Sequence, residues 1–277
     1  MQLILNPVRT HLKSTLPALV CILTGAITAS VVAQPVALNR SQLDQLVSRI
    51  ALYADPLLAQ VMTASTFREQ IPEAAKWADE HSYLKGDALA NAIQEDHLQW
   101  DPSVLALLPF PSVLDMMARN PAWTEQLGNA VLTQRAEVMD AVQRMRKKAK
   151  QYGYLKPNQY FNVVTDGGYV EILPLDPGLI YVPEYDPLVV FRGPAHGLVI
   201  GGAIRFGPGI TLTAAFAPWG GFWVGPAFVW SSHTILIDRG PWLRTWVNRG
   251  AYIHPYHAAR IVGPRIERHE LRAGIHR

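Results

Sequence analysis

One stretch of this chain limits its possible folds more than any other. Residues 206–237 contain no Asp, Glu, Lys or Arg, so we expect their side chains to leave water, either in a bilayer or against the rest of the protein. Each proline in a helix interior removes an amide donor and costs about 3 kcal/mol, and this stretch holds Pro208, Pro218 and Pro226. The sequence therefore predicts short strands or irregular chain here, not one continuous helix.

The environment of this stretch stays open at the level of sequence. Burial against the protein's own helices is the leading interpretation, because so broken a chain cannot satisfy its backbone polar groups as a single span in lipid. Membrane attachment or insertion is the alternative, since Trp favours membrane interfaces, and disorder is a third. Aromatic side chains gathered on one exposed face would mark an interaction surface. The residues expected to contact a membrane or partner there are Trp219, Phe222, Trp223, Phe228, Trp230, Arg239, Arg244 and Arg249.

The chain ends in a basic region, residues 239–277. It carries eight Arg, no Lys and two acids, a net charge of +6, which leaves −3 on the rest because the whole chain carries +3. This charge suits an anionic partner. We expect an anionic membrane surface, an envelope polymer or another envelope protein. Single-stranded nucleic acid, which the interleaved aromatics could stack on, is disfavoured in an exported protein.

The N-terminus has the composition of an export signal. Arg9 and Lys13 precede an apolar stretch, residues 16–32, and the small residues 30–33 offer a cleavage site before Gln34. An uncleaved anchor helix is the alternative interpretation. The expected location is the periplasm or cell envelope, with membrane association left open.

Residues 41–153 are typical of a run of helices. Apolar residues recur at helical spacing, and prolines mark helix starts. Ser41 is expected to cap the first helix, and three further caps are expected directly before prolines, at Asp55, Asp101 and Asn120. The longest helix should run from about residue 121 to 152, packed on its own domain or zipped to a partner helix, with Gly153 as its C-cap.

Five motifs in this part share one resemblance. They are residues 51–60 (ALYADPLLAQ), 84–89 (LKGDAL), 100–104 (WDPSV), 123–128 (WTEQLG) and 138–143 (VMDAVQ). In combination they resemble a bacterial family of domains of unknown function, number 3300, over about residues 42–191. The resemblance implies an exported or membrane-associated bacterial protein with a long hydrophobic region. It implies no activity, and it carries over no site residues.

After Pro157 apolar residues recur at every second position, the spacing of a β-strand. Residues 160–164 and 169–173 flank Thr165-Asp166-Gly167-Gly168, which predicts a β-hairpin. Residues 179–187 are typical of an edge strand, because Pro183 interrupts them. The predicted fold class is α+β: an N-terminal multi-helix body, a small antiparallel β element packed on it, and an apolar Gly/Pro/Trp-rich C-terminal segment.

No motif typical of a catalytic, cofactor or metal site is found in the sequence. It lacks a Gly-x-Ser-x-Gly elbow, a P-loop and a His-Glu-x-x-His motif. His254 and His257 lie three apart, but Pro255 between them and the lack of a near carboxylate favour a solvated tail over a metal site. Cys21 is the only cysteine, and lipidation there is disfavoured because Val20 precedes it.

Two functions from different classes follow from these patterns. The first is a non-enzymatic exported or membrane-associated envelope protein whose C-terminal region docks on a membrane or partner. The alternative is an envelope hydrolase acting on cell-wall or lipid material. The positions of four acids discriminate between these functions: Asp55, Asp101, Glu171 and Glu184. If their side chains meet in one cleft, the hydrolase is favoured. If they are dispersed, the non-enzymatic envelope protein is favoured. The expected organisation is a signal peptide (1–33), a linker (34–40), a helical domain (41–156), a small β segment (157–192), an apolar segment (193–238) and a basic tail (239–277).

Overall fold

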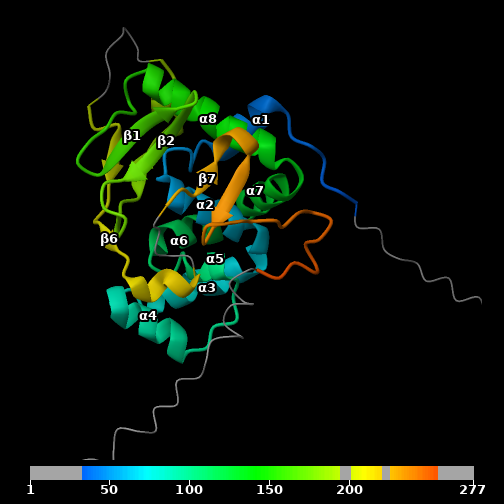
Figure 1. Ribbon diagram of the computed structural model, residues 1–277, viewed down its shortest axis with the longest axis vertical. Coiled ribbons are helices and arrows are strands. Elements are labelled where there is room, and N and C mark those ends of the chain that lie inside the picture. Colours follow the sequence, from blue (N-terminus) through cyan, green and yellow to red (C-terminus); the bar gives the residue numbers. More distant parts are fainter. Residues whose placement is uncertain (1–32, 194–200, 220–224, 255–277) are drawn as a thin grey trace, which may run out of the picture. The chain divides into compact units, whose positions relative to one another are not determined.

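The computed structural model describes residues 33–193, 201–219 and 225–254. The chain divides into two units, residues 1–33 and 34–277, and the description below concerns the second. Helices come first in it and short strands follow (Figure 1), which is the α+β class that the sequence predicts. The predicted signal peptide, apart from Ala33, lies outside the described residues, as does His257.

The helical body is built around α2 (Asp55–Ala64), in which every residue is buried. A mainly apolar helix that is buried on every side needs protein all around it. α2 contacts α5 (Pro102–Leu105) and α7 (Pro121–Thr133) as well as strands β2 (Tyr169–Pro174) and β8 (Thr234–Ile237). The other elements of the body are α1 (Arg40–Val47), η1 (Ser65–Gln70), α3 (Ile71–Glu80), α4 (Gly86–Glu95), α5 (Pro102–Leu105), α6 (Pro111–Arg119), α7 (Pro121–Thr133) and α8 (Arg135–Gln151).

Neighbouring helices pack closely around this centre. α1 packs on α8, α3 on α6, and α7 on η1. The last contact joins backbone to backbone, because a Cβ atom added at Gly128 of α7 would lie 2.1 Å from the carbonyl oxygen of Ser65. Among the described residues, no helix combines the length and the apolar character that crossing a membrane requires.

One of the four predicted N-caps is confirmed. Asp101 Oδ1 accepts a hydrogen bond from the Ser103 amide at 2.9 Å, at the start of α5. The cap predicted at Ser41 is wrong, because Asn39 caps α1 in a reciprocal capping box with Gln42, and Ser41 lies inside the helix.

The caps predicted at Asp55 and Asn120 are also wrong. Asp55 is the first residue of α2, and its carboxylate turns away from the helix end to meet Arg146. Asn120 Oδ1, the atom that would cap the next helix, accepts from Arg49 Nη1 at 3.0 Å, and Asn120 Nδ2 donates to the Met116 carbonyl at 2.7 Å. In both cases a more distant partner competes for the polar group that would otherwise cap.

The long helix expected over residues 121–152 is two helices, α7 and α8, separated at Gln134. Gln134 has φ −139° and ψ 42°, and its side-chain amide binds the backbone of Leu38, accepting from its N–H at 2.7 Å and donating to its carbonyl at 3.1 Å. The apolar stripe of both helices is buried in the protein's own core, so it forms no zipper to another chain. The C-cap is confirmed: Gly153 has φ +78°, and the Tyr154 amide reaches the Ala149 carbonyl at 2.9 Å.

The predicted β-hairpin is confirmed. β1 (Phe161–Asp166) pairs antiparallel with β2 (Tyr169–Pro174) around Gly167 and Gly168. These glycines have φ +53° and +84°, which a tight two-residue hairpin turn requires. In Figure 1 the hairpin (green) lies beside α8, and β2 contacts both α8 and α2.

The edge strand expected over residues 179–187 is two short strands with different partners. β3 (Leu179–Ile180) pairs with β6 (Ile210–Thr211), and β4 (Pro183–Tyr185) pairs with β5 (Ile204–Phe206), both antiparallel. α9 (Pro187–Val190) follows β4. The predicted β segment is therefore completed by strands from the apolar segment that follows it in sequence.

The stretch 206–237 forms no continuous helix in its described part, as its prolines predict. After β6 come η3 (Ala214–Trp219), β7 (Phe228–Val229), η4 (Trp230–Ser232) and β8 (Thr234–Ile237), and β9 (Gly240–Pro241) then extends β7–β8 to a three-stranded sheet. The leading interpretation, burial against the protein's own helices, holds for four of its large aromatic side chains, although Val229 is 39% exposed. Four aromatic side chains are at most 4% exposed: Phe216, Trp219, Phe228 and Trp230.

Candidate functional site

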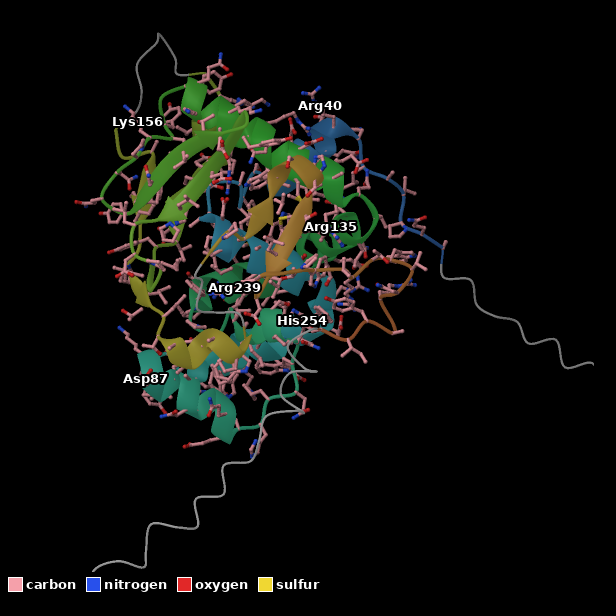
Figure 2. The ribbon with its side chains drawn as sticks, in the orientation of Figure 1. Arg40, Asp87, Arg135, Lys156, Arg239 and His254 are labelled. Atoms are coloured by element: carbon pink, nitrogen blue, oxygen red, sulfur yellow. The ribbon has the colours of Figure 1, made fainter. Side chains whose placement is uncertain are left out.

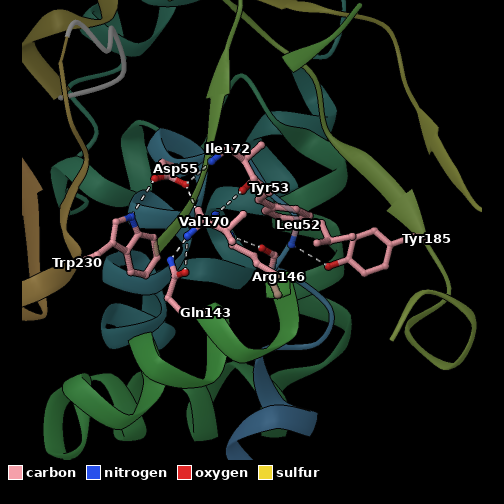
Figure 3. A network of polar contacts seen from close by, with 10 residues as sticks. Leu52, Tyr53, Asp55, Gln143, Arg146, Val170, Ile172, Tyr185 and Trp230 are labelled. Carbon is pink, nitrogen blue, oxygen red and sulfur yellow. Dashed lines mark hydrogen bonds and ion pairs between the residues drawn. The ribbon is translucent and has the colours of Figure 1, made fainter. Parts of the chain in front are cut away.

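The most connected polar group of the described chain is the guanidinium of Arg146, which is fully buried on α8 (Figure 3). Its Nη1 lies 2.6 Å from Asp55 Oδ1. It donates to three backbone carbonyls, those of Ala51, Tyr53 and Val170, at 2.8 to 3.0 Å. One side chain thus joins α8 to the loop before α2 and to β2.

Asp55 completes this network from the other side. Its carboxylate also accepts from the Ile172 amide at 3.3 Å and from Trp230 Nε1 at 3.2 Å. Burial raises the pKa of Asp55, while Arg146 and these hydrogen bonds oppose the rise. With side-chain exposures of 0% and 4%, Arg146 and Asp55 have no surface for a ligand. The network therefore holds the C-terminal sheet to the helices.

The four acids that discriminate between the two functions are dispersed. Asp55 is paired in the core and Asp101 caps α5. Glu171 lies on β2, where partial burial and then the charges of Asp55 and Asp166 raise its pKa. Glu184 is exposed on β4 and is the one of the four that lines a described pocket.

That pocket has a volume of about 320 Å³, near the lower end for small-ligand sites. Its wall is mainly apolar and comes from the α3–α4 connection, the bend before α6, and β6. The polar groups around it include His81, Lys85 and Glu184. The His81 ring stacks on Trp77 at 3.9 Å, and its Nδ1 lies 2.8 Å from the Trp77 carbonyl. Charged groups of both signs line the pocket, so the lining favours neither an anionic nor a cationic ligand.

A second candidate site is residues 239–254, which we call the strap. It starts at Arg239 and ends at His254, both labelled with Arg135 in Figure 2. Arg239 and Asp238 form a turn with φ 63° and 47°, a conformation rare for non-glycine residues. The strap contains no acid, although Asp238 directly precedes it.

The strap is anchored along α7 and the start of α8. The Trp242 amide binds the Ile235 carbonyl at 2.9 Å, and the Trp246 amide binds the Leu132 carbonyl at 3.2 Å. Arg135 on α8 donates to the Trp242 carbonyl at 3.1 Å. The Trp242 side chain is completely buried, so the strap belongs to the folded unit.

Its arginines pair with aromatic rings and carbonyls. Arg244, 8% exposed, lies with its guanidinium carbon 3.5 Å from the Phe67 ring centre and donates to the Thr66 carbonyl at 2.9 Å. Arg249 lies 3.8 Å from the Trp246 ring centre. Within the described ranges, no ion pair joins any strap arginine, or Arg135, to a carboxylate.

The strap also exposes large aliphatic side chains. Leu243 is 62% exposed, Val247 92% and Ile253 74%. Val247 lies at the tip of a turn in which the Thr245 amide donates to Asn248 Oδ1 at 2.6 Å. The strap thus combines exposed apolar side chains with arginines that have no carboxylate partner among the described residues.

The structure therefore corrects the expected contact residues. Trp219, Phe228, Trp230 and Arg244 are buried inside this unit, so they do not form the predicted exposed aromatic face. Arg239 is exposed and Arg249 half-buried, while Phe222 and Trp223 lie outside the described residues.

Sequence reasoning also misjudged the strap. His254, expected in a solvated tail, is 3% exposed beside Tyr252. It missed the exposed Leu243, Val247 and Ile253. The available signal was the regular placing of arginines among apolar residues without any acid.

These features lie in a chain whose residues 39–239 match the family described as "Protein of unknown function (DUF3300)", and the chain belongs to that family. α2, with the motif that begins at Ala51, is the buried centre of the matched part, and the strap after Arg239 lies beyond it.

The chain is also similar to a protein of Escherichia coli (strain K12) described as "Uncharacterized protein YacH". The two are 33% identical over 187 residues, which make up 56% of this chain and 30% of that protein. The chain thus matches less than a third of that relative's length. No solved structure matches it.

Proposed function

We propose that this chain is a non-enzymatic exported protein of the bacterial cell envelope that binds an anionic membrane surface through the strap. The observation that carries the proposal is the composition of the strap's surface. Leu243, Val247 and Ile253 expose apolar area, and the nearby Arg239 and Arg249 lack carboxylate partners among the described residues.

Apolar contacts and arginine charges should both contribute to binding at this surface. Burying an aliphatic side chain is worth about 1.5–3 kcal/mol, and a basic residue near an anionic surface about 1 kcal/mol. Three aliphatic side chains and two arginines therefore contribute several kcal/mol. Binding should be reversible and sensitive to salt.

The competing hydrolase has less support. Its four acids are spread over the core, a helix cap, β2 and β4, and only Glu184 lines a described pocket. The signal-like N-terminus supports export.

Vesicle flotation tests the docking surface. The purified protein should float with vesicles containing phosphatidylglycerol and not with purely zwitterionic vesicles, and high salt should weaken the binding. Val247→Ser should weaken it roughly tenfold, because the lost apolar contact is worth about 1.4 kcal/mol. The matched control is Leu188→Ser, since Leu188 is 64% exposed but belongs to α9, an element outside the strap. Equal binding by both variants, or no binding by the unaltered protein, overturns the proposal.

Export has a separate test. Protein recovered from the periplasmic or membrane fraction should begin at or near Gln34 when its N-terminus is sequenced. Protein found in the cytosol with Met1 intact contradicts the envelope location.

A further inference from the structure

The pocket of about 320 Å³ beside the α3–α4 connection is lined mainly by apolar residues. Four of these side chains are at most 9% exposed, and we call them the floor: Ala78, Leu89, Leu108 and Val182. Water in an apolar cavity finds few hydrogen-bond partners, and an apolar group that displaces it gains the free energy of leaving bulk water. The floor therefore favours the apolar body of a ligand.

The wall of this pocket is fixed by contacts between distant parts of the sequence. The floor comes from α3, α4, the bend before α6 and the residue before β4, and residues 207–209 of the β5–β6 connection face it. The chain that follows β6 is anchored at two points. The Leu212 amide donates to the Gly178 carbonyl at 2.8 Å, and Thr213 Oγ1 donates to Asp87 Oδ1 of α4 at 2.5 Å. The pocket is therefore preformed, which lowers the entropic cost of binding.

Two opposite charges belong to the exposed part of the lining. Lys85 comes from the α3–α4 connection and Glu184 from β4, and both residues are exposed. Neither forms an ion pair within the described ranges, although Arg205 lies opposite Glu184 in the β4–β5 register. An ammonium group and a carboxylate without ion-pair partners can bind the carboxylate and the ammonium group of one ligand.

The volume limits the ligand to a small molecule. At about 30 Å³ for each water in the liquid, the pocket has the space of roughly ten waters, and hence of roughly ten non-hydrogen atoms. Leucine and phenylalanine are of this size. Each carries both charges at one end and an apolar group at the other, as the lining requires.

We infer that this pocket binds a free amino acid with a large aliphatic or aromatic side chain. The side chain of the ligand packs on the floor, its carboxylate pairs with Lys85, and its ammonium group pairs with Glu184. No strap residue lines the pocket, so this site goes beyond the proposed membrane docking and does not depend on it.

Calorimetric titration of the purified protein with phenylalanine and three analogues tests the ligand class. Phenylalanine should bind at one saturable site. 3-Phenylpropanoate lacks the ammonium group and phenethylamine lacks the carboxylate, so each should bind roughly fivefold more weakly, the effect of one exposed ion pair. Glycine keeps both charges but has no apolar group to pack on the floor, so it should show no measurable binding.

Two variants test the site itself. Glu184→Gln should weaken phenylalanine binding roughly fivefold without weakening that of 3-phenylpropanoate, and Lys85→Gln should do the same without weakening that of phenethylamine. Both positions are exposed, so the variants should fold. The matched controls are Glu95→Gln and Lys156→Gln, since these residues are exposed and do not line the pocket. The controls should bind phenylalanine as the unaltered protein does.

Three results overturn the inference. They are no binding of phenylalanine by the unaltered protein, an analogue that binds as tightly as phenylalanine, and equal phenylalanine binding by the pocket variants and their controls. Val247→Ser, which alters only the strap, should bind phenylalanine normally. Loss of vesicle binding and loss of phenylalanine binding are thus separate outcomes, and each refutes only its own proposal.

Discussion

Removing either member of the buried Asp55–Arg146 pair should destabilise the fold severely. Arg146→Met withdraws the donor from the three carbonyls it serves and leaves the Asp55 carboxylate without its guanidinium. An unpaired buried acceptor costs about 1–3 kcal/mol, and breaking a buried ion pair about 3–5 kcal/mol. We expect a loss of about 5 kcal/mol, which is comparable with the total stability of a small domain.

Asp55→Asn should cost less, about 3 kcal/mol, because the amide keeps the size of the side chain and one acceptor oxygen. The double variant should lose less than the sum of the two single losses. Once Arg146 is gone, Asp55 no longer has a partner to lose, so we expect a coupling of about 2–3 kcal/mol.

An exposed pair of similar length provides the control. Arg119 Nε lies 2.7 Å from Asp115 Oδ1, but the two side chains are 78% and 52% exposed. Arg119→Met and Asp115→Asn should each change stability by about 0.5 kcal/mol or less. The two pairs differ in burial and hardly in distance, so the contrast isolates the effect of burial.

Urea unfolding followed by circular dichroism measures each free energy by linear extrapolation. Additive losses at Asp55 and Arg146, or a loss at Arg146 as small as that at Arg119, would refute the role assigned to the buried network.

Three further predictions concern single residues. Gly128→Ala should cost about 3 kcal/mol, because its Cβ would lie 2.1 Å from the Ser65 carbonyl oxygen, whereas Gly201→Ala, which meets no atom within 4 Å, should shift the thermal midpoint little. Burial raises the pKa of Asp101 from 3.8 to about 6, so the folded state binds this proton more tightly and stability should fall as pH rises from about 4 to 6. Asp101→Asn should reduce this loss of stability between about pH 4 and 6, measured by urea unfolding at each pH. If the variant loses as much stability as the unaltered protein over this range, the raised pKa of Asp101 is not its cause. Asn39→Ala should cost about 1 kcal/mol through loss of the capping box, and no measurable loss would mean that the cap is replaced.

Local signals in the sequence predicted the elements whose geometry depends on one or two residues. Gly167 and Gly168 supply the positive φ angles of the hairpin turn, and Gly153 supplies that of the α8 C-cap. The prolines of residues 206–237 kept that stretch out of a continuous helix. These constraints act within the residue or its immediate neighbours, so they hold in any tertiary environment.

The candidate site followed less well from sequence because it depends on burial. The basic charge of the strap was readable, and so was its mixture of arginine with aromatic residues. The sequence did not show which of these side chains face outward. Arg244 turns inward onto Phe67, while Val247 reaches the tip of a turn held by Thr245 and Asn248.

The sequence by itself determined the helix starts at prolines, the hairpin turn and the distribution of charge, because each follows from residues adjacent in the chain. It did not determine the break between α7 and α8, where Gln134 binds the distant Leu38. Only the tertiary structure decided which partner each polar group takes. Asp55 has the local context of a helix cap, yet it binds Arg146, Ile172 and Trp230, which come from three other elements. Trp230 has the character of a membrane-interface residue, yet it is buried in the same network. An apolar or charged group takes whichever partner lowers its free energy most, and distant segments supply that partner only once the chain has folded.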